Sequence, residues 1–341
     1  MPGSLVALGS NLGDRRMSLA RAVELLRADP RIRSLACSRF HETAPIGGAP
    51  GQGPFLNAAV CFETSHPPLA LHAALRHIEG SLGRERGERW VARAIDLDLL
   101  LYGDLVLDTE ALTVPHPRMA LRRFVLAPAV EVAPDMVHPV IGWTVARLLE
   151  HLKTALSYVA LLGPAGGGKT ALAASLAQAV CGRFLADPAI GHDEPHPPDR
   201  PSHIYRRQIE FLDRRAELLD CRHWPGGEEP TISDFYWDQC LAYARLELDD
   251  RGFETFCHAV ERARPNVISP KLLVVLDIPQ DDLCGWATAA EIAREPHEWV
   301  RLRSELLRLA ALPDRGPVLV VNAADHRAQV DEVAAAIEAM K

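Results

Sequence analysis

Hydrophobic positions in the first 153 residues change their spacing from one segment to the next. Three short apolar runs predict strands, at residues 5–8, 57–64 and 95–102. Three longer segments have apolar positions at helical spacing and predict helices, at residues 15–27, 68–82 and 144–152. Strands follow strands as often as helices do. We therefore expect an α+β layer with a mainly antiparallel sheet.

The pattern starts again after residue 156. Four almost continuous apolar runs predict buried strands, at residues 157–162, 231–235, 272–278 and 318–322. Helical stretches separate these runs, which is typical of a parallel sheet covered on both faces. A chain of 341 residues is also long for one compact domain. We expect two domains, residues 1–153 and 157–341, the second of them an α/β domain.

Composition narrows the class of protein. Hydrophobic residues make up 48% and charged residues 24%, as in ordinary globular proteins. A net charge of −8 argues against a nucleic-acid partner. The seven cysteines are dispersed without a Cys-x-x-Cys pair, which indicates reduced thiols rather than a disulfide framework or a zinc site. With no run near the roughly 18 apolar residues of a membrane span, we expect a soluble cytoplasmic protein without a membrane partner.

Asp96 and Asp98 form the most informative pair in the first half. They are two residues apart in a predicted strand, so both carboxylates point to one face. Converging carboxylates repel unless a cation lies between them, and Mg²⁺ prefers such ligands. Cations that could bind phosphate flank the pair: Arg84, Arg86, Arg89, Arg93, His116, Arg122 and Arg123. Taken alone, this pattern is evenly balanced between a magnesium–polyphosphate site and a polar strand face with ordinary salt bridges.

The segments around this pair decide between the two. They are Ala-Leu-Gly-Ser-Asn-Leu-Gly at 7–13, Thr-Ala-Pro-Ile at 43–46, Phe-Leu-Asn-Ala-Ala at 55–59, Ile-Glu at 78–79 ahead of Leu-Gly-Arg at 82–84, Arg-Trp-Val-Ala-Arg-Ala-Ile-Asp-Leu-Asp at 89–98 and Leu-Thr-Val-Pro-His-Pro-Arg-Met at 112–119. In this order and spacing they closely resemble the 6-hydroxymethyl-7,8-dihydropterin pyrophosphokinase family, over about residues 3–150. The resemblance implies a ferredoxin-like α+β fold. It also implies a step of folate biosynthesis, in which ATP gives its β,γ-pyrophosphate to the pterin hydroxymethyl group and leaves AMP.

The same resemblance implies roles for single residues. Four would be catalytic, with the aspartates ligating two Mg²⁺ ions: Arg84, Arg93, Asp96 and Asp98. Five would hold the pterin, by ring stacking or at its hydrogen-bonding edge: Thr43, Ile46, Phe55, Asn57 and Phe124. Six would line the ATP site: Glu79, Arg86, Trp90, Thr113, His116 and Arg122. Phe55 stands where a tyrosine is often found, so one hydroxyl contact is lost while the stack remains.

A phosphate-binding loop opens the second half. The segment Gly163-Pro-Ala-Gly-Gly-Gly-Lys-Thr170 matches G-x-x-x-x-G-K-[ST] between a predicted strand and a predicted helix. Backbone N–H groups and the helix N-terminus would bind phosphates, and Thr170 would ligate Mg²⁺. The residues predicted to bind ATP here are Gly163, Gly166, Gly168, Lys169 and Thr170.

Two further stretches narrow the second half. Gln208 and Arg215 are seven residues apart and so share one helical face, and the segment 231–238, which contains Ser233-Asp234, ends a predicted buried strand. Together with the phosphate loop they resemble the deoxynucleoside kinase family, over about residues 157–341. There Gln208 would pair with the base, Arg215 would support that contact, and Asp187 would be the catalytic base. Two departures weaken the match: Ser233-Asp234 replaces a Glu-Arg pair, and the lid stretch 281–296 offers only Arg294.

Three interpretations of the second half stay open: an active nucleoside kinase, a nucleotide-binding domain of weak catalysis, and a dimerising module. We expect a fusion of both kinds of domain. Its small-molecule substrates would be hydroxymethyl-dihydropterin, ATP and a deoxynucleoside, and its second half would form a homodimer. One rival hypothesis makes the second half the primary enzyme and the first half regulatory. Another makes the chain a nucleotide-binding interaction protein without enzymatic activity.

Overall fold

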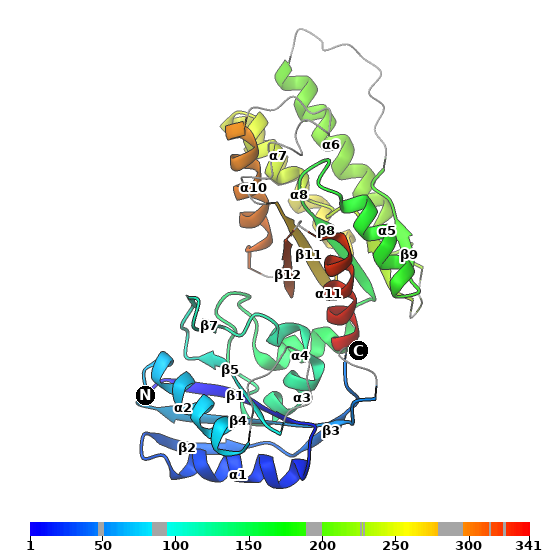
Figure 1. Cartoon of the computed structure of the whole chain (residues 1–341). Coiled ribbons are helices and arrows are strands. Elements are labelled where there is room, and N and C mark those ends of the chain that lie inside the picture. The colour runs from blue at the N-terminus through cyan, green and yellow to red at the C-terminus, as the bar shows by residue number, and fades with distance from the viewer. Residues whose placement is uncertain are drawn as a thin grey trace. The chain divides into compact units, whose positions relative to one another are not determined.

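The computed structural model describes residues 1–46, 51–83, 94–188, 200–225, 227, 229–278, 296–313, 315–322 and 325–341. The chain forms two compact units. Unit 1 consists of Met1–Thr154 with Ala335–Lys341, and unit 2 of Ala155–Ala334 (Figure 1). Among the described residues, no helix is both long enough and apolar enough to cross a membrane.

Unit 1 contains one five-stranded antiparallel sheet. Its strands are β1 (Gly3–Ser10), β2 (Ile32–Cys37), β3 (His41–Thr43), β4 (Phe55–Thr64) and β5 (Asp96–Tyr102). Their order is β2-β4-β1-β5, and β3 also pairs with β4. Helix α1 (Arg15–Ala28) joins β1 to β2, and helix α2 (Pro68–Ser81) leads from β4 to β5. Each connection passes one intervening strand. These two interleaved βαβ units confirm the predicted ferredoxin-like α+β fold.

The sheet is covered on both faces. One face packs Val6, Leu8 and Val60 against α1 and α2 in a single buried cluster. The other face packs against α3 (Arg123–Val132), which contacts β1 and β4. Helix α4 (Val145–Thr154) packs on α3. The chain between β5 and α3 adds the short strands β6 (Leu107–Asp108) and β7 (Thr113–Val114) and the 3₁₀ turn η1 (Met119–Leu121).

Local pattern explains which elements of unit 1 the sequence predicts. Helix α1 begins after Asp14, whose Oδ1 accepts the Met17 N–H at 2.9 Å, and its apolar stripe is regular. Strand β2 was not predicted, because Ile32 is its one buried residue. Helix α3 was not predicted either, since it carries Pro128 in its interior. In both cases tertiary packing outweighs the local signal.

Unit 2 contains a parallel sheet. Its strands are β8 (Tyr158–Leu162), β9 (Arg183–Leu185), β10 (Thr231–Ser233), β11 (Leu272–Asp277) and β12 (Val318–Asn322), in the order β12-β11-β8-β10-β9. The helices described in this part of the chain are α5 (Lys169–Ala179), α6 (Arg200–Leu218), α7 (Cys240–Glu247), α8 (Asp250–Ala263), α10 (Pro296–Ala310) and α11 (His326–Ala339), with a 3₁₀ turn η2 (Arg264–Asn266). The residues of α11 from Ala335 on belong to unit 1. The chain leaves β8 to one side for β9 and β10 and later returns to the other side for β11. The predicted α/β fold is confirmed, and β8 lies at the switch point where ligands usually bind.

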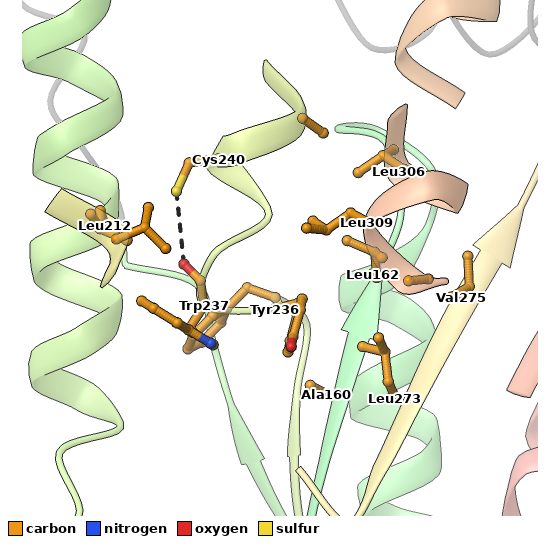
Figure 2. Packing of buried hydrophobic residues seen from close by; sticks show 14 of the residues in the cluster. Ala160, Leu162, Leu212, Tyr236, Trp237, Cys240, Leu273, Val275, Leu306 and Leu309 are labelled. Atoms are coloured by element: carbon orange, nitrogen blue, oxygen red, sulfur yellow. Dashed lines mark hydrogen bonds between the residues drawn. The ribbon is translucent and has the colours of Figure 1, made fainter. Parts of the chain in front are cut away.

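One buried cluster of unit 2 lies between this sheet and the helices of one face. Ala160 and Leu162 on β8 are paired in register with Leu273 and Val275 on β11, and all four side chains are buried. Figure 2 shows this layer together with Leu212 of α6 and the pair Leu306 and Leu309 of α10. Burying such side chains stabilises the fold by roughly 1.5–3 kcal/mol each, before the entropy of ordering them is counted. The carboxyl end of β8 is thereby held on a rigid platform.

Candidate functional site

The aspartate pair of unit 1 lies on one open face of strand β5. Asp96 and Asp98 are partly exposed, whereas Leu97 and Leu99 between and after them are buried in the core with α1 and α2. The side chain of Asp98 is 39% exposed, and its Oδ2 lies 3.9 Å from His116 Nε2 and 4.0 Å from Arg122 Nη1. Both carboxylates therefore point away from α1 and α2, as the alternation predicts.

A row of three residues connects this pair to the neighbouring strands. In the sheet register Gly9 of β1 is paired with Asn57 of β4 on one side and with Asp96 of β5 on the other. Asn57 Nδ2 donates to Thr43 Oγ1 at 2.8 Å. A Cβ added at Gly9 would lie 3.4 Å from Asn57 Oδ1, so the glycine keeps side-chain atoms out of the space between the amide and the carboxylate.

His116 brings a neutral donor to the same face. Its Nδ1 accepts the N–H of Arg118 at 3.1 Å, so the neutral ring carries its proton on Nε2, the nitrogen facing Asp98. Burial, together with Arg122 and Arg118, lowers the pKa of His116 to about 4 against the opposing effect of Asp96. At neutral pH the imidazole can therefore donate a hydrogen bond to an oxygen without adding charge.

A cavity of about 220 Å³ adjoins Asp98. Its lining residues are His72, Leu97, Asp98, Leu99, Ala111, Leu112, Thr113, His116 and Pro117. Two of the residues predicted to bind ATP, Thr113 and His116, line it. His72 of α2 was not predicted, although its spacing of seven residues from Glu79 places both on one helical face. The cavity combines apolar walls with a few polar groups, as small-molecule sites do.

Glu79 acts on the site through the backbone. Its side chain is buried near the end of α2, and Oε1 accepts the N–H of Leu97 at 2.7 Å. Leu97 stands between the two aspartates, so this bond fixes the part of β5 that carries them. A buried carboxylate is costly without hydrogen bonds, which makes Glu79 a positioning residue for the pair.

The phosphate loop of unit 2 follows β8 directly. Gly166 and Gly168 have φ values of +73° and +81°, which favour glycine. A Cβ at Gly163 would lie 3.2 Å from the Cβ of Leu276, so the loop start must stay small. Lys169 Nζ donates to the Pro164 carbonyl at 2.8 Å. Burial lowers the pKa of Lys169 to about 8, although Asp187 and Asp234 nearby raise it.

Asp234 joins this loop to the neighbouring strands. Thr170 Oγ1 donates to Asp234 Oδ2 at 2.6 Å, and the N–H of Asp187 donates to Asp234 Oδ1 at 2.6 Å. A loop hydroxyl beside a strand-end carboxylate is the ligand pair by which P-loop enzymes hold Mg²⁺. Sequence reasoning did not assign Asp234 to the site. Its place directly after β10, next to β8 in the sheet, was the available signal.

Two polar pairs lie between α6 and its neighbours. Arg215 donates to both carboxylate oxygens of Asp187, with Nε–Oδ1 at 2.7 Å and Nη2–Oδ2 at 2.5 Å. Gln208 Nε2 donates to Glu247 Oε2 at 3.1 Å. The structure therefore brings the predicted base Asp187 together with Arg215, while the amide of Gln208 is paired with a residue of α7.

Known proteins are similar to the first part of this chain. The family described as 7,8-dihydro-6-hydroxymethylpterin-pyrophosphokinase matches residues 5–134. The 2-amino-4-hydroxy-6-hydroxymethyldihydropteridine pyrophosphokinase of Methylorubrum extorquens is 43% identical over 152 residues, which are 45% of this chain and 94% of that protein. The chain belongs to this pyrophosphokinase family. The enzyme of the same name from Bacillus subtilis is 46% identical over 127 residues, 37% of this chain and 75% of the relative.

The similar solved structures match about half of this pyrophosphokinase-family chain. The deoxyadenosine kinase from M. mycoides with bound dATP is 16% identical, with a TM-score of 0.44, over 52% of this chain and 96% of that chain. The same kinase with bound dCTP is 16% identical with a TM-score of 0.43, over 52% of this chain and 96% of that one. At this level of similarity, only the side chains of unit 2 itself bear on its function.

The described residues contain part of the predicted pyrophosphokinase site. Phe55 begins β4 and is paired with Thr43, and Phe124 is the second residue of α3, with the Arg122 guanidinium 5.7 Å from its ring centre. Ile46 is half-buried just after β3. The remaining predicted residues lie outside the described part of the chain: Arg84, Arg86, Trp90 and Arg93 in unit 1 and Arg294 in unit 2.

Proposed function

We propose that unit 1 transfers the β,γ-pyrophosphoryl group of ATP to the hydroxymethyl group of 6-hydroxymethyl-7,8-dihydropterin, releasing AMP. Membership of the pyrophosphokinase family supports this activity. The row Asn57–Gly9–Asp96 carries the proposal for this chain, because it puts a hydrogen-bonding amide and an anionic metal ligand side by side on one face of the sheet. Acceptor and polyphosphate could then meet over Gly9.

Asp96 and Asp98 would hold Mg²⁺, two ions in our proposal. Within the described ranges no three His, Cys, Asp or Glu side chains converge, so substrate oxygens and water would complete the coordination. Two partly exposed carboxylates on one strand face fit that requirement. When bound, Mg²⁺ neutralises polyphosphate charge. Glu79 keeps the strand in register beneath the pair.

The other predicted residues would bind the two substrates. Asn57 and Thr43 would satisfy the polar edge of the pterin, with Ile46 beside them, and the rings of Phe55 and Phe124 would stack on its faces. For ATP, four more residues would donate to the phosphates or line the base: Thr113, His116, Arg122 and Trp90. Arg84, Arg86 and Arg93 would clamp phosphate oxygens, because guanidinium groups bind them in bidentate fashion.

The first test measures AMP. The protein is incubated with Mg-ATP and hydroxymethyl-dihydropterin, and AMP should accumulate with the pterin pyrophosphate. Asp98→Ala should lower this rate by at least about a thousandfold, because metal and phosphate lose a ligand at the reacting centre. Nucleotide binding at Lys169 should persist in this variant. Formation of ADP alone, and only with a deoxynucleoside, would contradict the proposal.

We propose in addition that unit 2 binds Mg-ATP and phosphorylates a deoxynucleoside. The supporting observation is the cluster of Lys169, Thr170, Asp187, Arg215 and Asp234 at the carboxyl ends of β8, β9 and β10. Gly163, Gly166 and Gly168 would let the loop backbone approach the phosphates. Asp187, held by Arg215, would accept the proton of the nucleoside hydroxyl, and Gln208 would read the base.

The second test uses the four common deoxynucleosides. With Mg-ATP the chain should convert some of them to monophosphates, and Lys169→Ala should remove this activity while leaving AMP formation in unit 1 intact. Nucleotide binding without turnover of any deoxynucleoside would favour a domain of weak catalysis. A dimer that forms without nucleotide binding would favour a dimerising module, and the proposed homodimer is checked in the same samples by light scattering.

A further inference from the structure

Two of the three buried side chains described on α6 are polar. Gln208, Leu212 and Arg215 follow one another at spacings of four and three residues and are 3%, 1% and 4% exposed, and Leu219, the residue after the helix, continues the stripe at 0%. Such a stripe normally carries apolar residues throughout. Leu212 keeps to this rule and points from α6 toward Cys240 and Trp237 (Figure 2). Each buried polar side chain therefore needs a fixed partner, since an unpaired one is costly.

The partner of Gln208 fixes which way its amide points. Glu247, the last residue of α7, is a carboxylate with an exposed fraction of 13%, and its Oε2 accepts from Gln208 Nε2 at 3.1 Å. Arg207 Nη2 lies 3.4 Å from the same oxygen and balances its charge. A carboxylate only accepts hydrogen bonds. The NH₂ group of Gln208 must therefore face Glu247, and turning the amide over would bring two acceptors together.

A fixed amide presents one pattern to a ligand. Gln208 Oε1 is an acceptor in a known place, and the second hydrogen of Nε2 is a donor beside it. The complementary edge is an exocyclic amino group next to an unprotonated ring nitrogen. Adenine has this edge at its 6-amino group and cytosine at its 4-amino group. Thymine, uracil, guanine and hypoxanthine have the reverse, a carbonyl next to a ring N–H.

We propose that Glu247 sets the amide of Gln208 so that unit 2 selects amino-bearing bases, adenine and cytosine, over bases with a carbonyl at that edge. The inference rests on the proposed nucleoside function of unit 2 and adds its substrate class. Glu247 is then a positioning residue, because it acts through Gln208 and needs no contact with the nucleoside.

Two pairs of nucleosides test this without any mutation. Deoxycytidine and deoxyuridine have nearly the same size, as do deoxyadenosine and deoxyinosine, and within each pair the recognised edge is reversed. Binding to the full chain is measured by calorimetry with ADP and Mg²⁺ present. We expect the amino member of each pair to bind about tenfold more tightly or better, because the wrong edge leaves buried groups unsatisfied.

A variant then assigns the selectivity to Glu247. In Glu247→Gln the new amide can donate or accept, so Gln208 can turn over and both ratios should fall about tenfold, toward unity. Glu210→Gln is the matched control, since Glu210 lies on α6 near Gln208 in sequence but pairs with Arg214 at 2.6 Å on the exposed side of that helix. It should keep both ratios. Thermal melting checks that each variant is folded.

The possible outcomes distinguish a failure of the proposed base selectivity from a failure of the proposed nucleoside function of unit 2. Equal binding within each pair by the wild-type chain, or unchanged ratios in a folded Glu247→Gln variant, would overturn the selectivity role alone. A chain that binds ADP but neither member of either pair would overturn the nucleoside function and the inference with it. Tighter binding of the amino member of each pair, with ratios that fall in Glu247→Gln and persist in Glu210→Gln, would support both.

Discussion

The two sites of this chain treat charge in opposite ways. In unit 1 the carboxylate of Asp98 is 39% exposed, and two neighbouring side chains, the neutral imidazole of His116 and the guanidinium of Arg122, lie 3.9 and 4.0 Å away. In unit 2 the side chain of Arg215 is 5% exposed and binds Asp187 at 2.5 Å, and Thr170 binds Asp234 at 2.6 Å. The first site is an open sheet face, whereas the second is a set of short internal bonds.

This difference indicates how each site would receive a ligand. On the face of unit 1, metal and phosphate would complete the environment of groups that water already reaches. In unit 2, a ligand must share or replace partners that are already in place, as at Thr170 and Asp234. Mutations should therefore affect mainly activity in unit 1, and both activity and stability in unit 2.

The largest effect is expected from Arg215→Met. This variant leaves Asp187, whose side chain is 27% exposed, without its bidentate partner, and breaking this partly buried pair should cost about 3 kcal/mol of unfolding free energy, the low end of the range for buried pairs. Arg214→Met on the exposed side of the same helix should cost less than about 1 kcal/mol. Urea denaturation measures the unfolding free energy of both variants, and hydrogen exchange of α6 peptides shows whether the loss of stability lies at this helix.

A matching substitution in unit 1 should affect activity rather than stability. Arg122→Met removes a cation 4.0 Å from Asp98 and should change the unfolding free energy by less than about 1 kcal/mol, while AMP formation falls. Equal losses of stability in Arg122→Met and Arg215→Met would show that the two sites do not differ in the way their geometry indicates.

Sequence patterns predicted what depends on local spacing. The alternation of Asp96 and Asp98, the phosphate loop and the parallel strands of unit 2 all follow from periodicity. The closeness of Thr170 and Asp234 does not, because it depends on β10 lying beside β8 although 64 residues separate the two side chains. The three-residue strand β9 is likewise too short to leave a pattern.

The direction in which a side chain points is the second feature that the sequence did not predict. Glu79 was predicted to line the ATP site, and that role stays a prediction, but its carboxylate turns inward to the Leu97 N–H. A helical pattern gives the face on which a residue lies, not the atom that it will reach. His72 was overlooked because a histidine on a half-buried helix face is unremarkable until β5 closes the cavity beside it.

Acidic pH should destabilise unit 1 through His138. In unit 1 the buried ring of His138 is held neutral, because burial lowers its pKa to about 4, and its Nδ1 accepts the Ile141 N–H at 3.3 Å. The unfolded chain takes up this proton near pH 6.5, so stability is lost as the pH falls from 6.5 toward 4. The loss from this group should reach roughly 3 kcal/mol at pH 4.

His138→Asn provides the control for that pH dependence. The amide oxygen can still accept the Ile141 N–H but takes up no proton in this range. Its unfolding free energy, measured by urea denaturation at pH 7 and pH 4, should therefore fall by about 3 kcal/mol less than that of the wild-type chain. An identical fall in both proteins would remove His138 as the cause.

The smallest effect tests whether the face of unit 1 is really open at Gly9. A Cβ in Gly9→Ala would lie 3.4 Å from Asn57 Oδ1, which is tight but not a clash, and it would stand between the amide and Asp96. We expect KM for the pterin to rise about threefold to tenfold, with a smaller change in KM for ATP, because only the acceptor would lie over Asn57. Gly80→Ala on α2, where an added Cβ meets nothing within 4 Å, should leave both constants unchanged. A Gly9→Ala enzyme with wild-type KM values would mean that the pterin does not lie across this row. The open sheet face would then have to receive it elsewhere.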